Sequence, residues 1–67
     1  MVDKVFGANA GKVWGALKSK GRLDAKGLEK ATRLKPENVF GALGWLAKEG
    51  KVRIIRHGNK HAYELTE

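Results

Sequence analysis

The stretch Pro36–Val52, PENVFGALGWLAKEGKV, decides the fold, because it predicts one helix, a glycine stop and the first residues of a strand. Proline is favoured in the first turn of a helix, where its missing N–H would have no partner in any case. A rotation of about 100° per residue places the apolar side chains on one arc that we expect to face a core: Val39, Phe40, Leu43, Leu46 and Ala47. Gly50 suits the left-handed position that ends helices, and the apolar period then changes from helical to alternating. We therefore expect a helix that leads directly into a strand.

The C-terminal segment predicts a hairpin with its two-residue turn at Gly58-Asn59, a dipeptide suited to turns that need positive φ. Counting outward from this turn pairs His57 with Lys60, Arg56 with His61, Ile55 with Ala62, Ile54 with Tyr63, Arg53 with Glu64 and Val52 with Leu65. In this register the apolar side chains share one face: Val52, Ile54, Tyr63 and Leu65. Arg53 and Glu64 then lie opposite each other on the other face, and a slip of one residue would destroy both features.

The N-terminal half predicts two further helices. Residues 1–8 form a short apolar lead-in, and Asn9 is a good N-cap for a helix that ends at Lys20 before Gly21. The inner side of this helix carries Ala10, Val13, Trp14 and Leu17.

A second helix is predicted over Ala25–Thr32, with Asp24 as its N-cap and with Leu28 and Ala31 on its inner side. Arg22-Leu23 before it is long enough for a single bridge of strand. The turn Arg33–Lys35 follows, with Leu34 pointing inward and with Lys35 as a weak cap for the helix that starts at Pro36.

Composition limits the classes of function. The 67 residues form one small domain, 1–67, with a formal net charge of +7, which favours acidic partners such as phosphate polyanions. The chain has no Cys and two His, so it predicts neither a disulfide framework nor a metal site. No apolar run approaches the ~20 residues of a membrane span, and we find no signal-peptide pattern. We expect a cytoplasmic protein without a membrane partner.

The predicted order, helix–strand–helix–helix–strand–strand, resembles the winged helix-turn-helix domain, an α+β class that is mainly helical. The residues that carry this resemblance are Leu28, Ala31, Thr32, Leu34, Val39, Leu43, Leu46, Gly50 and Val52. More narrowly, the segments NAGKVW (Asn9–Trp14) and ALGWLAKEGKV (Ala42–Val52) resemble a family of small prokaryotic winged-helix proteins of unassigned function.

The resemblance implies double-stranded DNA as a partner and a transcription-related role. It makes the helix from Pro36 the reader of the major groove and the segment Arg56–His61 the tip of the wing. The candidate DNA-binding residues on the helices and the turn are Lys26, Lys30, Arg33, Lys35, Asn38 and Lys48. Those on the wing are Arg53, Arg56, His57 and Lys60.

The outward side of the expected reading helix is poor in groups that recognise bases. It carries Glu37, Asn38, Gly41, Gly44, Trp45 and Lys48. Only Asn38 and Lys48 suit a hydrogen bond to a base or phosphate, so we expect contacts mainly to phosphates, with weak or no sequence preference.

Trp45 beside Gly41 and Gly44 supports an alternative function, a protein-interaction or homodimer surface that Phe40 could extend. Two other interpretations stay open for Trp45: burial under a strap of Val2, Val5 and Phe6, or stacking on a nucleic acid.

Catalysis is not expected, because no nucleophile stands near an activating base, and His57 and His61 fall on opposite faces of the hairpin. We assign no catalytic residue, cofactor, metal or small-molecule ligand.

Overall fold

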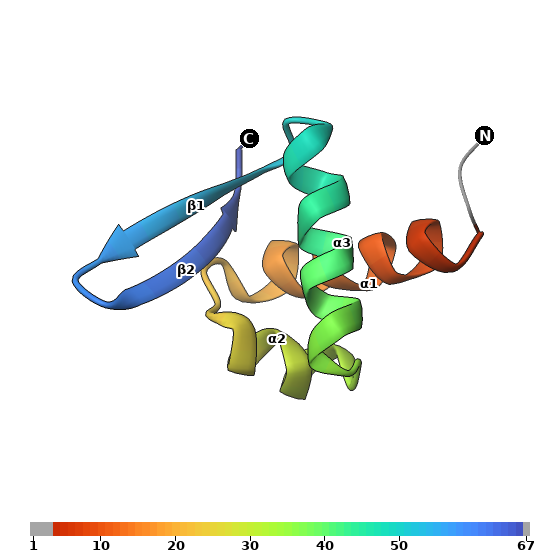
Figure 1. Cartoon of the computed structure of the whole chain (residues 1–67), viewed down its shortest axis with the longest axis horizontal. Helices are drawn as coiled ribbons and strands as arrows, with labels where there is room; N and C mark the ends of the chain where they lie inside the picture. The colour runs from red at the N-terminus through yellow and green to blue at the C-terminus, as the bar shows by residue number, and fades with distance from the viewer. Residues whose placement is uncertain (1–3, 67) are drawn as a thin grey trace.

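A computed structural model describes residues 4–66, with side chains from Gly7 onward, as three helices and one antiparallel hairpin. The elements are α1 (Lys4–Lys20), α2 (Ala25–Thr32), α3 (Pro36–Lys48), β1 (Val52–His57) and β2 (Lys60–Leu65). Figure 1 shows α3 crossing α1, with α2 beside them and the hairpin extending away on the side opposite the N-terminus. This is the winged helix-turn-helix architecture that the sequence predicts.

The first predicted strand is a single bridge, so the described residues hold two strands where the sequence-based order has three. Leu23 and Tyr63 exchange both backbone hydrogen bonds: the Leu23 N–H donates to Tyr63 O at 3.1 Å and the Tyr63 N–H donates to Leu23 O at 2.8 Å. The pairing stops there because the next residue, Asp24, already caps α2. The bridge joins the helices to β2.

The predicted start of the first helix at Asn9 is wrong, since α1 begins at Lys4 and includes most of the expected lead-in. The segment Lys4–Ala8 contains no proline, and the helix continues through it. A good capping residue such as Asn9 does not start a helix where the chain before it can stay helical. The strap proposed for Val2, Val5 and Phe6 lies outside the residues whose side chains are described.

The local signals around α2 are confirmed. Asp24 Oδ1 accepts a hydrogen bond from the Gly27 N–H at 2.7 Å, as an N-cap does. Arg33 ends the helix in the left-handed region, at φ 61°, and its N–H donates to Glu29 O at 2.7 Å. Lys35 precedes α3 without a side-chain capping bond, as expected.

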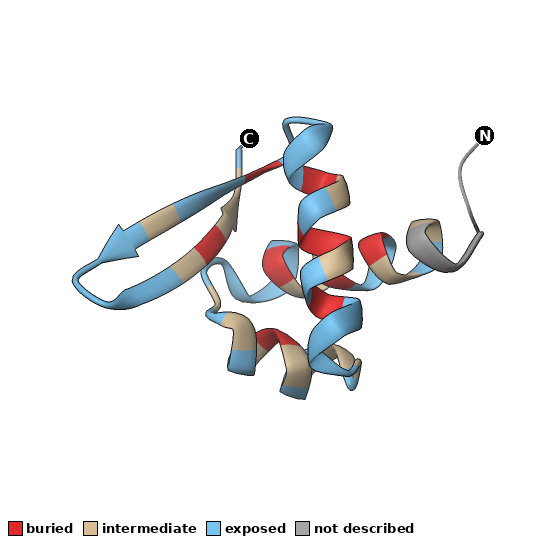
Figure 2. Cartoon of the chain, viewed as in Figure 1, coloured by how far each residue is buried: buried red, intermediate tan, exposed pale blue. Residues whose placement is uncertain are grey.

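The core lies where the three helices meet and extends to the base of the hairpin (Figure 2). Its buried members are Ala10, Val13, Leu17, Leu28, Val39, Ala42, Leu43, Leu46, Val52 and Tyr63. Three residues expected inside are exposed instead, namely Ala31, Phe40 and Ala47. The buried side of α3 is turned toward Ala42, because α1 packs against that side of the helix. Trp14, also predicted in the core, is half-buried at its edge.

The hairpin has the predicted register from Val52 paired with Leu65 to His57 paired with Lys60. Gly50, at φ +72°, makes the predicted left-handed turn between α3 and β1, and Gly58, at φ +63°, begins the tight turn. On the inward face Val52 and Tyr63 are buried. Within residues 4–66, no helix is long and apolar enough to cross a membrane.

Candidate nucleic-acid interface

The cations expected on α2 and on the following turn are all exposed: Lys26, Lys30, Arg33 and Lys35. Lys26 and Lys30 are exposed because α2 turns Leu28 into the core and leaves its opposite side to solvent, and Arg33 and Lys35 lie on the turn that follows. Both ion pairs among the described residues involve Glu64 of β2, so none uses these four cations. Their charges are available to an anionic partner.

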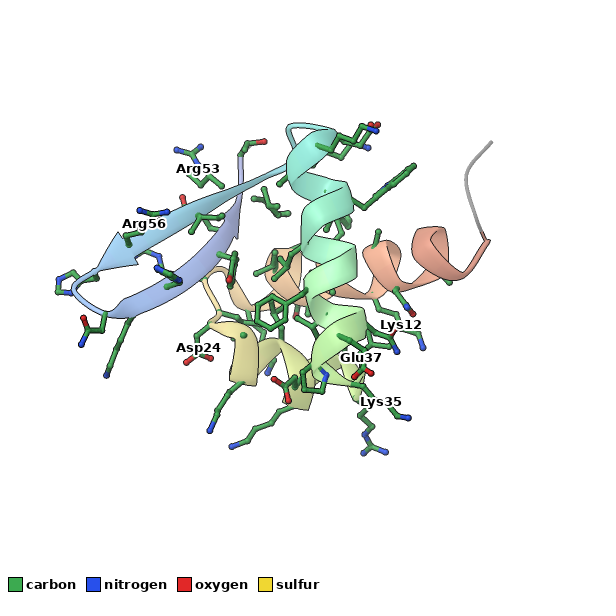
Figure 3. All side chains as sticks on the ribbon, in the orientation of Figure 1. Lys12, Asp24, Lys35, Glu37, Arg53 and Arg56 are labelled. Carbon is green, nitrogen blue, oxygen red and sulfur yellow. The ribbon has the colours of Figure 1, made fainter. Side chains whose placement is uncertain are left out.

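The wing residues divide between the two faces of the hairpin. Successive side chains alternate in a strand, so Arg56 and its partner His61 share the face of Ile54, whereas Arg53 and His57 lie on the other face. Figure 3 shows Arg56 on the hairpin and Lys35 beside the start of α3, so positive charge lies both on the wing and at the N-terminal end of α3.

Arg53 is already engaged within the chain. Its Nε lies 3.6 Å from Glu64 Oε2, and its Nη2 donates to the backbone oxygen of Thr66 at 3.0 Å. Arg22 pairs with the other oxygen of the same carboxylate, at 3.1 Å from Nη2 to Oε1. The pair Arg53–Glu64 follows from the predicted register, while the contribution of Arg22 does not. Arg53 is therefore less available to a ligand than Arg56.

Charges from α2 and β2 converge in one hollow beside α3. Its lining residues are Asp24, Ala25, Lys26, Phe40, Lys60, His61 and Tyr63. The hollow brings Lys26 and Lys60 together, although 34 positions separate them in the sequence. Asp24 adds a negative charge at its edge, but this carboxylate is engaged as the α2 cap. The arrangement can hold an anionic group between two elements.

An apolar groove continues from this hollow between α3 and the hairpin. We call it the α3–β1 groove; it has a volume of about 200 Å³, and its lining residues are Phe40, Leu43, Gly44, Ala47, Val52, Ile54 and Tyr63. Phe40 and Tyr63 line both the groove and the hollow, so the two adjoin. Phe40 and Ile54 are 53% and 54% exposed, which makes them the exposed large hydrophobic side chains of the groove.

The polar residues of α3 do not meet at this groove. Glu37, Asn38 and Lys48 are exposed, and the ten positions from Asn38 to Lys48 span about 15 Å along a helix. Glu37 and Lys35 lie together at the start of α3 (Figure 3). The groove side of the helix thus carries no long hydrogen-bonding side chain.

Trp45, part of the alternative interface, is half-buried against α1. It shares a hollow of about 230 Å³ with Trp14 and Gly11, on the side of α3 away from the hairpin. Gly44 is exposed and Gly41 is half-buried. An apolar contact surface centred on Trp45 is therefore smaller than the sequence suggests.

Three residues that line the hollow or the groove are absent from the predicted DNA-binding set: His61 of the wing tip, Ile54, and Phe40, which the sequence placed both on the core arc and on a possible protein-contact surface. The predicted register already placed His61 opposite Arg56 and Ile54 on the same face. Among the described residues, no group of three or more His, Cys, Asp or Glu is placed to hold a metal ion.

Solved structures with the same architecture include a protein of Bacteroides thetaiotaomicron determined by solution NMR, which is 38% identical with a TM-score of 0.88. The chain aligns over 97% of its own length and 79% of that protein. No curated protein matches the chain.

Two further solved structures are also similar. BpsR of Bordetella bronchiseptica, whose DNA binding is regulated by 6-hydroxynicotinic acid, is 25% identical with a TM-score of 0.82. The antimony-specific transcriptional repressor AntR is 30% identical with a TM-score of 0.72. The match covers 88% and 84% of this chain, but only 43% and 50% of those two proteins.

A family model described as a winged helix-turn-helix domain, DUF2582, matches residues 1–65. This match spans the three helices and the hairpin of the structure. The chain belongs to the DUF2582 family of winged helix-turn-helix domains.

Proposed function

We propose that this protein binds double-stranded DNA through α2, α3 and the hairpin, mainly by phosphate contacts and in a transcription-related role. One observation carries the proposal: exposed cations that form no ion pair within residues 4–66 lie beside α3 on two separate elements. Lys26 and Lys30 lie on α2 and Arg56 and Lys60 lie on the hairpin, and Lys26 and Lys60 line one hollow beside Phe40 of α3. The similarity to BpsR, which binds DNA, and to the transcriptional repressor AntR supports the same role.

The proposed docking places α3 in the major groove, with the flanking cations over the phosphates that border it. Lys26 and Lys60 converge beside Phe40, so one phosphate can sit between α2 and β2. Arg33 and Lys35 extend the contact past the start of α3, and His57 adds to it at the wing tip. Arg53 and Lys48 lie at the margin of this surface, Arg53 because Glu64 engages it.

Weak sequence preference follows from the side chains of α3. Bidentate contacts to guanine or adenine come from Arg, Lys, Asn or Gln. Within α3 only Asn38 and Lys48 belong to this set, and Lys48 stands in the last turn of the helix. The proposal is therefore one of binding and positioning, without catalysis.

A salt titration tests this function. A fluorescent duplex of about 15 base pairs is titrated with protein between about 50 and 200 mM salt, and affinity is read by anisotropy. If Lys26, Lys30, Arg33, Lys35, Arg56 and Lys60 each neutralise one phosphate, the slope of log K against log salt approaches about −5. Affinity that does not change with salt would refute the proposal.

A pair of charge variants locates the surface. Lys26→Gln should reduce the slope by about 0.9, because one phosphate contact is lost. Lys18→Gln is the matched control: Lys18 lies over the Trp14 ring at 4.8 Å, in a hollow lined by residues of α1, β2 and the connection between α1 and α2. Equal reductions of the salt slope in the two variants would indicate that net charge, and not the proposed face, governs binding.

A second candidate is a protein contact on the α1–α3 side, favoured by the shared hollow of Trp14 and Trp45. Analytical ultracentrifugation of the wild type and of Trp45→Ala tests it. Self-association of the wild type that is lost in Trp45→Ala would support this candidate. A wild type that stays monomeric at high concentration would refute a homodimer.

A further inference from the structure

The α3–β1 groove presents an apolar surface where a reading helix usually carries polar side chains. Phe40 lies in the second turn of α3 and is 53% exposed, and Ile54 of β1 is 54% exposed. Of the α3 residues that line the groove, Phe40 is the largest, since Gly44 and Ala47 add little to the surface. A Cβ at position 44 would meet no atom within 4 Å, so the surface beside Phe40 is open.

The positive charge beside this apolar groove limits the kind of ligand that the groove can bind. The groove shares Phe40 with the hollow that Lys26, Lys60 and His61 also line, where the carboxylate of Asp24 is engaged as the cap of α2. An occupant must therefore present an apolar group close to negative charge. Double-stranded DNA does so in its major groove, where the C5-methyl group of thymine stands between the two phosphate backbones.

The position of Phe40 along the helix agrees with such a contact. Side chains in the N-terminal part of a recognition helix are the ones that reach base edges. Phe40 is the fifth residue of α3, and the cations that would hold phosphates lie beside it on α2 and β2. The C-terminal part of α3, by contrast, leads through Gly50 into the hairpin.

We propose that Phe40, supported by Ile54, recognises thymine methyl groups in the major groove, so that the protein prefers A·T-rich duplexes. This inference rests on the proposed DNA-binding function and supplies the base preference that the polar residues of α3 do not. Aromatic contact with the thymine methyl is one of the recognised modes of base readout. The preference is modest, because it uses apolar contact without a bidentate hydrogen bond.

Duplexes that differ only in methyl groups test the inference. An A·T-rich duplex is compared with the same sequence carrying deoxyuridine in place of thymidine. A G·C-rich duplex is compared with its 5-methylcytosine form, which places a methyl group in the major groove. Burial of one such group corresponds to roughly a fourfold change in affinity, so we expect at least this loss with deoxyuridine and a gain with 5-methylcytosine.

Three variants assign the effect to the groove. Phe40→Ala should bind the thymidine and deoxyuridine duplexes equally, whereas Phe40→Leu keeps an apolar side chain and should keep the discrimination. Ile55→Ala is the matched control, because Ile55 lines a hollow on the other face of the hairpin. It should discriminate as the wild type does.

The outcomes separate this inference from the function on which it rests. Salt-dependent binding with equal affinity for thymidine and deoxyuridine duplexes would overturn methyl recognition and leave DNA binding intact. No binding to any duplex at low salt would overturn the proposed function itself. If Phe40→Ala is folded by circular dichroism and still binds the thymidine duplex more tightly than the deoxyuridine duplex, a residue other than Phe40 makes the methyl contact. If Phe40→Ala does not fold, methyl recognition is still tested by the affinities of the wild type and of Phe40→Leu for the thymidine and deoxyuridine duplexes.

Discussion

The junction between the proposed reading helix and the wing depends on one backbone conformation, at Gly50. Its φ of +72° lies in the left-handed region, and the next residue, Lys51, donates its N–H to Leu46 O at 2.8 Å to close the helix end. A Cβ at position 50 would meet no atom within 4 Å. Gly50→Ala therefore costs only backbone strain, about 1–2 kcal/mol in the free energy of unfolding.

The same substitution at Gly44 should have the opposite sign. Gly44 lies inside α3 without a positive φ, and its Cβ would also meet nothing within 4 Å. Alanine is favoured over glycine in a helix interior by about 1 kcal/mol. Gly44→Ala should therefore stabilise the domain by about that amount, so that one added methyl group destabilises at one site and stabilises at the other.

Thermal and urea unfolding, followed by circular dichroism, measure both effects. A domain of this size shifts in Tm by roughly 4–8 °C per kcal/mol, so the two variants should move in opposite directions by amounts that are easily resolved. Gly50→Asn is a useful control because asparagine tolerates the left-handed region, and it should lose less than Gly50→Ala. A neutral or stabilising Gly50→Ala would refute the left-handed junction.

Three further substitutions test the packing and the charges. Asp24→Ala removes the N-cap of α2 and should cost about 1 kcal/mol in urea unfolding, whereas Asp24→Asn keeps a cap and should cost less. Leu28→Ala empties a fully buried position and should cost about 2–5 kcal/mol, enough to leave much of so small a domain unfolded by circular dichroism. Glu64→Gln removes the partner of Arg22 and Arg53, both exposed, and should change stability by less than about 1 kcal/mol while strengthening duplex binding at low salt. Weaker binding by Glu64→Gln would contradict the charge argument.

Local signals in the sequence predict much of this fold. The hairpin register follows from its two-residue turn at Gly58 and from the alternation of apolar side chains, and the structure has that register. The cap at Asp24 and the glycine stop at Gly50 are also local, because each depends on bonds within one turn of a helix.

The orientation of α3 could not be predicted in the same way. A helical wheel ranks side chains by hydrophobicity, but the buried side is set by the element that packs against it. Here α1 packs against the side of Ala42, so Phe40 and Ala47 come to the surface and Trp45 becomes half-buried. Only the packing of α1 against α3 in the structure shows this rotation.

The candidate site was likewise only partly predictable from the sequence. Composition and resemblance predicted basic residues on α2 and the wing, but the sequence does not show that Lys26 and Lys60 meet beside Phe40. That meeting depends on the bridge between Leu23 and Tyr63, which joins the start of α2 to β2. The apolar groove likewise arises from two elements and has no signature within either one.

An NMR titration of ¹⁵N-labelled protein with a duplex of about 15 base pairs tests DNA binding most directly, at about 50 and about 200 mM salt. We expect amide shifts concentrated at residues 24–41 and 53–61, including Phe40, that weaken steeply at the higher salt. Shifts confined to the Trp14 and Trp45 side, or no shifts at the lower salt despite a net charge of +7, would contradict the proposed interface.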